Sequence, residues 1–147
     1  MRVYLDVCCY NRPYDDQSQL TVKLEAQAKL SVQRMIKDGE HELVTSEILR
    51  FEVANCPIEI RRIVVTDFME KYSSLHVDKG CSPTVKEMAR EIIATGVKYK
   101  DACHIASALI ADCDYLITTD KRMAKYKSDR IKVVNPIEFI AEMEGEI

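Results

Sequence analysis

Short apolar runs alternate with longer stretches of helical periodicity along the chain. The apolar runs favour strands, and they lie at about residues 3–7, 42–45, 115–119 and 131–134. Amphipathic or apolar segments of helical length separate them. This alternation is typical of a parallel sheet with helices on both faces. We therefore predict an α/β fold, a three-layer α/β/α sandwich around a mainly parallel sheet of four or five strands.

Local start and stop signals bound the predicted helices. Asp16 with Gln19 fits a capping box ahead of a long helix, which Asp38-Gly39 ends. Ser46 is placed to cap the helix after the second strand, and Ser82-Pro83 opens a later one. Between the helices we predict a loop at 8–16, irregular chain at 74–81 and a short basic helix after residue 120. The apolar stripe expected on the long helix contains Leu20, Leu24, Ala28, Val32 and Met35 or Ile36.

Acidic residues lie beside the most apolar segments. Asp101 is in the first turn of a helix predicted over 101–111, which is apolar nearly all round, and Asp120 follows a buried strand. Asp6 ends the first strand, and Glu52 lies on an apolar stripe of the helix after the second strand. In a parallel α/β sheet, helix N-termini and strand carboxyl ends face the same edge. We therefore expect these four carboxylates to converge at one edge.

Carboxylates this close repel one another unless a cation neutralises them. Oxygen ligands suit Mg²⁺ or Mn²⁺, which can activate water and stabilise a phosphodiester transition state. Each acid also has a structural interpretation: Asp101 as a helix cap, Asp120 as a turn residue and Glu52 as the partner of a buried Arg or Lys. Asp6 has the weakest structural account. For His104, one turn beyond Asp101, a packed or surface position is favoured over a place in the site.

Size and composition exclude several classes of protein. The chain has 147 residues, 47% of them hydrophobic, which suits one domain over 1–147. Its apolar runs are shorter than the roughly 18 residues of a membrane span. An acid in the first apolar run argues against a signal peptide. The six cysteines form neither a C-x-x-C pair nor a zinc-like spacing with His. We therefore expect a cytoplasmic protein with reduced thiols and no membrane contact.

Charge is distributed unevenly along the chain. The net charge of −3 argues against a large nucleic-acid footprint. Residues 121–132, however, are strongly basic and contain a single acid, Asp129. Two interpretations stay open: a solvated surface, or contact with phosphates, which the position directly after Asp120 favours. Arg12, in the predicted loop, is a second candidate for phosphate contact.

The acidic segments resemble the signatures of PIN-domain ribonucleases, many of which are VapC-type toxins of prokaryotic toxin–antitoxin pairs. The resemblance spans nearly the whole chain in the right order. Val7-Cys8-Cys9 departs from it, since many members carry a small polar residue after the first acid. The matching segments are Y-L-D ending at Asp6, T-S-E-I-L-R-F-E ending at Glu52, K-D-A-C-H-I-A-S-A around Asp101, and Y-L-I-T-T-D ending at Asp120.

The resemblance implies a metal-dependent endoribonuclease acting on single-stranded or loop RNA. Asp6, Glu52, Asp101 and Asp120 would be the catalytic and Mg²⁺- or Mn²⁺-binding residues. Substrate contacts are expected from Arg12, Thr118, Thr119, Lys121 and Arg122. A homodimer is also expected, which the apolar helices at 17–37 and 57–72 favour, and for a toxin an antitoxin segment over the acidic cleft. The alternative is a PIN-like domain that binds RNA or a protein without catalysis.

Two other families also place an acid after the first strand. A phosphatase of the haloacid dehalogenase type would need a second acid and then a Thr or Ser where Cys8 and Tyr10 stand. A receiver domain would need an N-terminal acid pair, a mid-chain Asp that ends a strand and a late Lys, and the spacing fails. The sequence therefore disfavours both.

Overall fold

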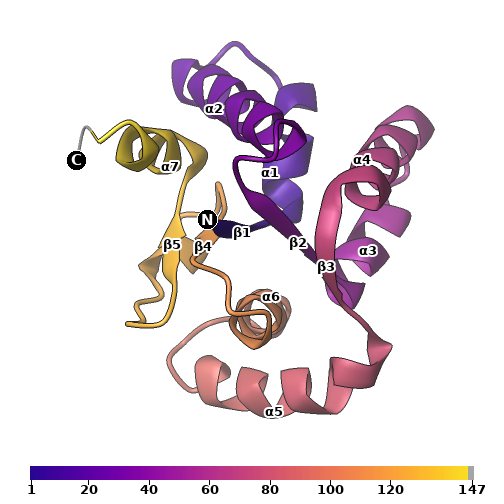
Figure 1. Cartoon of the computed structure of the whole chain (residues 1–147), viewed down its shortest axis with the longest axis vertical. Coiled ribbons are helices and arrows are strands. Elements are labelled where there is room, and N and C mark those ends of the chain that lie inside the picture. The colour runs from indigo at the N-terminus through magenta and orange to yellow at the C-terminus, as the bar shows by residue number, and fades with distance from the viewer. Residues whose placement is uncertain (146–147) are drawn as a thin grey trace.

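A five-stranded parallel sheet runs through the centre of the computed structural model, which describes residues 1–145 (Figure 1). The strand order is β3-β2-β1-β4-β5, and every neighbouring pair is parallel. This confirms the predicted α/β sandwich. The strands are β1 (Arg2–Leu5), β2 (Glu42–Ser46), β3 (Ser73–Val77), β4 (Tyr115–Ile117) and β5 (Lys132–Val134).

Helices cover both faces of the sheet. In Figure 1, α1, α2 and α7 lie on one side and α5 and α6 on the other, while α3 and α4 lie toward the β3 end. The helices are α1 (Val7–Asn11), α2 (Leu20–Lys37), α3 (Glu47–Ala54), α4 (Glu59–Tyr72), α5 (Ser82–Ile93), α6 (Tyr99–Ile110) and α7 (Pro136–Met143). Short 3₁₀ turns are η1 (Arg12–Tyr14), η2 (Lys79–Cys81) and η3 (Met123–Lys125).

The core lies around β1 and α6. Val3, Tyr4 and Leu5 are fully buried because β1 is the central strand, with a neighbour on each side. In α6, residues 102–109 are all buried, as expected for a helix that is apolar nearly all round. The body of α6 is therefore packed inside the fold, while its first turn reaches the surface.

The chain after β1 differs from the prediction. Residues 7–11 form a helix instead of a loop, and the strand ends at Leu5. Asp6 is the N-cap of this helix, because its carboxylate accepts the backbone N–H of Val7. Cys9 and Tyr10 are buried on the inner side of α1. The N-cap at Asp6 and the burial of Cys9 and Tyr10 together favour a helix over a loop at residues 7–11.

The start of α2 and the first half of its buried face differ from the prediction, while Val32 and Ile36 are buried as expected. Asp16 accepts the N–H of Ser18 in a local turn, and Gln19 at the N-cap makes no side-chain cap bond. Leu20 and Leu24 are 69% and 42% exposed. The buried face instead contains Glu25, Ala26, Lys29, Val32 and Ile36. An ion pair between Glu25 and Arg12 of η1 turns this polar position inward.

Two further segments differ from the sequence-based expectations. Residues 73–77, expected to be irregular, form the edge strand β3. Most of its side chains are exposed, so the segment lacks the alternation of apolar and polar residues by which a strand is recognised in a sequence. The basic helix expected after residue 120 is only the 3₁₀ turn η3. Helix α5 includes Ser82, with Cys81 at the N-cap, so the predicted start is off by one residue.

The state of the cysteines agrees with the sequence analysis. All six cysteines are free thiols. Over residues 1–145, the model contains no helix with the length and hydropathy needed to cross a bilayer.

Candidate active site

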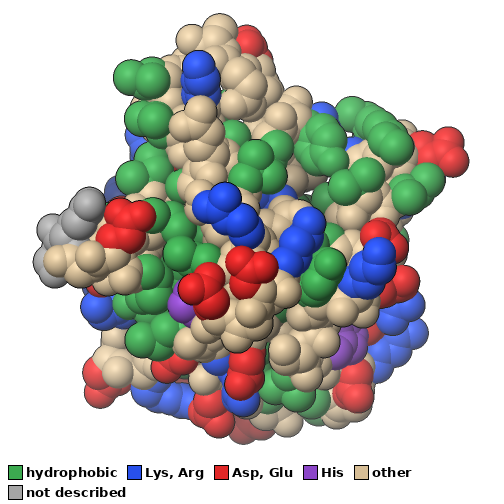
Figure 2. Space-filling view, turned by 45° about the horizontal axis from the view of Figure 1, so that its top comes forward, with side chains coloured by type: hydrophobic (Ala, Val, Ile, Leu, Met, Phe, Trp, Pro, Cys, Tyr) green, Lys and Arg blue, Asp and Glu red, His purple; other side chains and the backbone are tan. Residues whose placement is uncertain are grey.

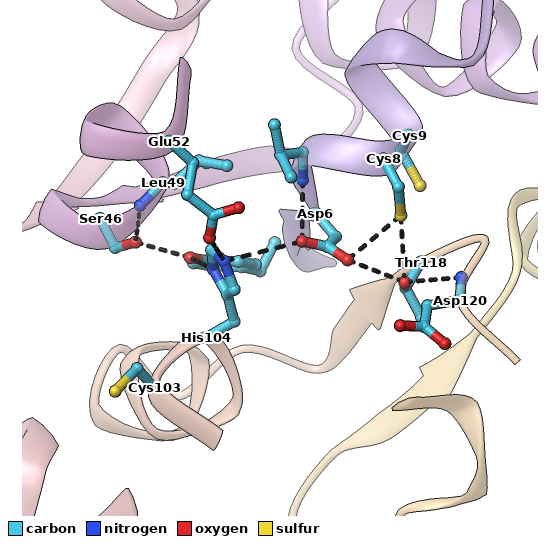
Figure 3. Close-up of polar contacts among 12 residues, drawn as sticks. Asp6, Cys8, Cys9, Ser46, Leu49, Glu52, Cys103, His104, Thr118 and Asp120 are labelled. Atoms are coloured by element: carbon cyan, nitrogen blue, oxygen red, sulfur yellow. Dashed lines mark hydrogen bonds and ion pairs between the residues drawn. The ribbon is translucent and has the colours of Figure 1, made fainter. Parts of the chain in front are cut away.

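Asp6 is fixed in a buried position at the carboxyl end of β1. Its Oδ1 accepts the N–H of Val7 at 2.8 Å. Its Oδ2 accepts the hydroxyl of Thr118 at 2.9 Å and the thiol of Cys8 at 3.2 Å (Figure 3). The residue is only 5% exposed. These contacts stabilise the ionised carboxylate and hold it in one orientation.

Asp120 is tied to Asp6 through Thr118. The backbone N–H of Asp120 donates to the Thr118 hydroxyl at 3.0 Å, and Asp120 Oδ1 accepts the N–H of Arg122 at 2.8 Å. Because Thr118 is fully buried, its hydroxyl orients the two acids. Thr119 is half-buried, and its N–H donates to the Cys8 sulfur at 3.3 Å. Residues 118–120 thus connect the end of β4 to the start of α1 through hydrogen bonds.

Asp101 shares this space from the first turn of α6. Burial raises the pKa of Asp101, and the charges of Asp120 and Asp6 raise it further. This direction is the one expected where carboxylates crowd together. The pKa of Asp101 therefore responds to both of the acids at the carboxyl edge of the sheet.

Glu52 reaches the site through His104. The Nε2–H of His104 donates to a carboxylate oxygen of Glu52, and the same nitrogen lies 3.8 Å from Asp6 Oδ1 (Figure 3). The Glu52 side chain is 19% exposed and belongs to α3. It thus lies at the rim of the cluster, connected to Asp6 only through His104.

His104 is a site residue that the sequence analysis did not favour. It is 1% exposed, and its Nδ1 hydrogen-bonds the Tyr4 hydroxyl at 2.6 Å. Tyr4 in turn bonds Ser46, whose hydroxyl oxygen also caps α3 by accepting the N–H of Leu49. Burial lowers the pKa of His104, but the hydrogen bond to Glu52 and the nearby carboxylates outweigh it and raise the pKa. The available signal was the i, i+3 spacing from Asp101, which places both residues on one face of α6.

The donor set fits a partly hydrated divalent ion. Within the part of the chain that the structure describes, no three His, Cys, Asp or Glu side chains are close enough to form a metal site. Mg²⁺ commonly keeps several waters and uses only one or two carboxylates directly. Asp6, Asp101 and Asp120 supply oxygen ligands of the preferred kind, with Asp6 already oriented by neighbouring donors. The residues therefore suit Mg²⁺ or Mn²⁺ bound partly through water.

The candidate substrate-binding residues differ in their surroundings. Lys121 and Arg122 are exposed directly beside Asp120, which leaves their charges accessible to phosphates. Arg12 lies in an internal ion-pair network instead. Its Nη2 is 3.0 Å from Glu25, and its Nη1 is 3.0 Å from Asp15. The geometry therefore points to a structural task for Arg12.

Arg12→Gln is expected to lower the free energy of unfolding by about 2–3 kcal/mol. The expected loss is smaller than the loss on removing one partner of a fully buried ion pair, because Arg12 stays partly exposed. The cost arises from Glu25, a 4% exposed carboxylate that loses its charged partner. Urea denaturation followed by circular dichroism measures the change. The double variant Arg12→Gln/Glu25→Gln should recover much of the loss. A stable single variant with weakened RNA binding would instead identify Arg12 as a phosphate contact.

Comparisons with known proteins agree with the fold. A family model described as the PIN domain matches residues 20–129. One similar solved structure is VapBC2 from Rickettsia felis bound to a DNA fragment from its promoter. The TM-score is 0.54 at 14% identity, and the match covers 92% of this chain and 98% of that chain. FitAcB from Neisseria gonorrhoeae has a TM-score of 0.51 at 18% identity, with coverage of 91% and 97%. FitAB bound to an IR36 DNA fragment has a TM-score of 0.50 at 16% identity, with coverage of 92% and 95%. No curated protein matches the chain.

Proposed function

Because this chain belongs to the PIN-domain family, we propose that it is a Mg²⁺- or Mn²⁺-dependent endoribonuclease that acts in the cytoplasm on single-stranded or loop RNA. The observation that carries the proposal is the link from Asp6 through Thr118 to Asp120, together with Asp101, whose pKa is raised first by burial and then by the charges of Asp120 and Asp6. Three separate elements contribute these carboxylates to one edge of the sheet. Such a cluster costs electrostatic energy in the free protein, and a bound cation offsets that cost.

Asp6, Asp101 and Asp120 would hold the ion, with Glu52 acting through water or at a second ion. When bound, the ion supplies a Lewis acid for the phosphodiester and an activated water for hydrolysis. This assignment requires no nucleophilic side chain from the protein. It is consistent with an oxygen-only ligand set.

The protein's own contribution is to hold these groups before the substrate arrives. The Val7 N–H and the Thr118 hydroxyl orient Asp6, while His104 orients Glu52. Preorganised charges need no rearrangement at the moment of reaction. Lys121 and Arg122 lie beside the cluster and would bind the phosphates that flank the cleaved bond, so that binding weakens at high salt.

A protein partner forms a second part of the proposal. The names of the similar structures, VapBC2 and FitAB, support a toxin of a type II toxin–antitoxin pair. Figure 2 shows hydrophobic side chains gathered on the upper and right-hand parts of the molecule, where α2 and α4 lie in Figure 1. Leu20 on α2 and Ile60 on α4 are 69% and 64% exposed. Exposed apolar surface of this kind supports a homodimer contact or an antitoxin contact.

The decisive experiment is an RNA cleavage assay with purified protein. We expect cleavage of a fluorogenic single-stranded RNA with Mg²⁺ or Mn²⁺, its loss on addition of EDTA, and its return when the metal is restored in excess. Loss on chelation is expected because, in the proposed mechanism, the ion supplies both the activated water and the Lewis acid. RNA binding without cleavage under all metal conditions would contradict the proposal and support the non-catalytic alternative.

A further inference from the structure

A groove of about 1200 Å³ lies between helices that carry candidate site residues and the start of α5. Its walls are α3, the link from β3 to α5, the first turns of α5, and α6, all of which can be followed in Figure 1. Its volume exceeds the usual range for a single drug-sized ligand. The groove thus has room for more than one nucleotide.

The two helices that carry site residues also form this groove. On α3, Glu47, Ile48, Phe51 and Ala54 line the groove, while Glu52, the residue after Phe51, hydrogen-bonds His104. On α6, Tyr99, Cys103 and Ser107 line it with a helical spacing of four residues. Asp101 shares the first turn of α6 with Tyr99 but lies on the other side of the helix, as the two-residue spacing requires. The groove and the carboxylate cluster are therefore two sides of the same helix pair.

The groove combines exposed rings with positive charge. Phe51 is 62% exposed and Tyr99 is 54% exposed, although both are large apolar side chains. Such exposure is expected where a ligand supplies the missing contact. Arg50, Lys79 and Lys86 bring three positive charges to the lining, against Glu47 and Asp78. His76 lies 3.1 Å from the Glu47 carboxylate, so this acid is already partnered.

We propose that this groove binds unpaired bases of the RNA next to the cleaved phosphodiester, with Phe51 and Tyr99 as stacking platforms. The inference rests on the proposed function for the position of the cleaved bond. Rings accept any unpaired base, whereas paired bases are already stacked on their neighbours. Arg50, Lys79 and Lys86 complement the phosphates between the stacked bases. The groove thus accounts for a preference for single-stranded or loop RNA over duplex.

RNA affinity measured without catalysis tests the groove separately from the nuclease. Fluorescence anisotropy in EDTA with a labelled single-stranded oligonucleotide reports binding alone. We expect Phe51→Leu and Tyr99→Leu each to weaken binding about 5- to 100-fold, the range that corresponds to one lost base stack. Phe51→Tyr and Tyr99→Phe keep the rings and should bind like the wild type. Lys86→Gln should lower the slope of log affinity against log salt by about one.

A matched surface control comes from α5. Ile93→Ala removes an exposed apolar side chain outside the groove and should leave RNA affinity unchanged. Unchanged affinity in both ring-to-Leu variants overturns the proposal, as does undetectable RNA binding by the wild type. If the variants instead turn a dimer into a monomer in sedimentation without loss of RNA affinity, the groove is a contact between copies and the proposal is wrong. Weakened binding by these variants in a protein that never cleaves RNA supports the groove while refuting the nuclease.

Discussion

Asp6→Asn and Asp120→Asn are each expected to lower kcat for RNA cleavage by more than about 100-fold, since each removes a charged ligand of the proposed ion. The fold should persist. Asn is as good an N-cap as Asp, so the Val7 N–H keeps an oxygen acceptor in Asp6→Asn. Removing one charge from a repelling cluster also lowers the electrostatic cost of the free protein. Steady-state cleavage assays beside thermal melts separate the two effects.

Asp114→Asn is the matched control for this pair. Asp114 lies just before β4, at the opposite edge of the sheet, where its carboxylate accepts the N–H of Arg2 at 2.8 Å. The amide oxygen of Asn can accept the same hydrogen bond, so normal cleavage is expected. Full activity of Asp120→Asn with divalent metal would refute the proposed mechanism.

Substitution of His104 should have the second-largest effect. His104→Leu removes the donor that orients Glu52, and we expect kcat to fall about 10- to 100-fold, as for other residues that position metal ligands. KM for RNA should change little, because His104 is 1% exposed and has no direct access to the substrate. The apparent Mn²⁺ concentration for half-maximal activity should rise.

The conservative variant separates positioning from a purely structural effect. The amide nitrogen of Gln can replace Nε2–H as a donor to Glu52, so His104→Gln should recover much of the kcat lost in His104→Leu. Tyr4→Phe removes the hydroxyl at Nδ1 but leaves the Nε2 donor, so a smaller loss is expected. If His104→Gln and His104→Leu lose activity and thermal stability equally, His104 only packs the core.

Local rules predicted the parts of the fold that depend on strong patterns. The apolar runs of β1, β2, β4 and β5 and the continuous burial of α6 follow directly from hydrophobicity. Asp6 and Asp120 could be placed at one edge because the carboxyl ends of parallel strands coincide. The order of elements therefore indicated which acids meet, although they are far apart in sequence.

Tertiary contacts determined what the sequence analysis missed. Strand β3 forms by pairing with β2, and its exposed residues carry no alternation of their own. The rotation of α2 depends on the Arg12–Glu25 pair, which joins η1 to the helix and overrides the leucine stripe. The place of His104 depends on Tyr4 and Glu52, from a strand and a helix distant in sequence. None of these partners can be identified from local periodicity.

The strand order also determines when the carboxylates can meet during protein synthesis. β1 pairs with β4, and the Thr118 hydroxyl that holds Asp6 is 112 positions further along the chain. A ribosome releases the N-terminal part first, and contacts between distant segments form late in folding. Asp6 and Glu52 therefore leave the ribosome well before the segment that completes their site. Under the proposed activity, the growing chain cannot cut its own messenger RNA or the ribosome until residues beyond 120 have emerged.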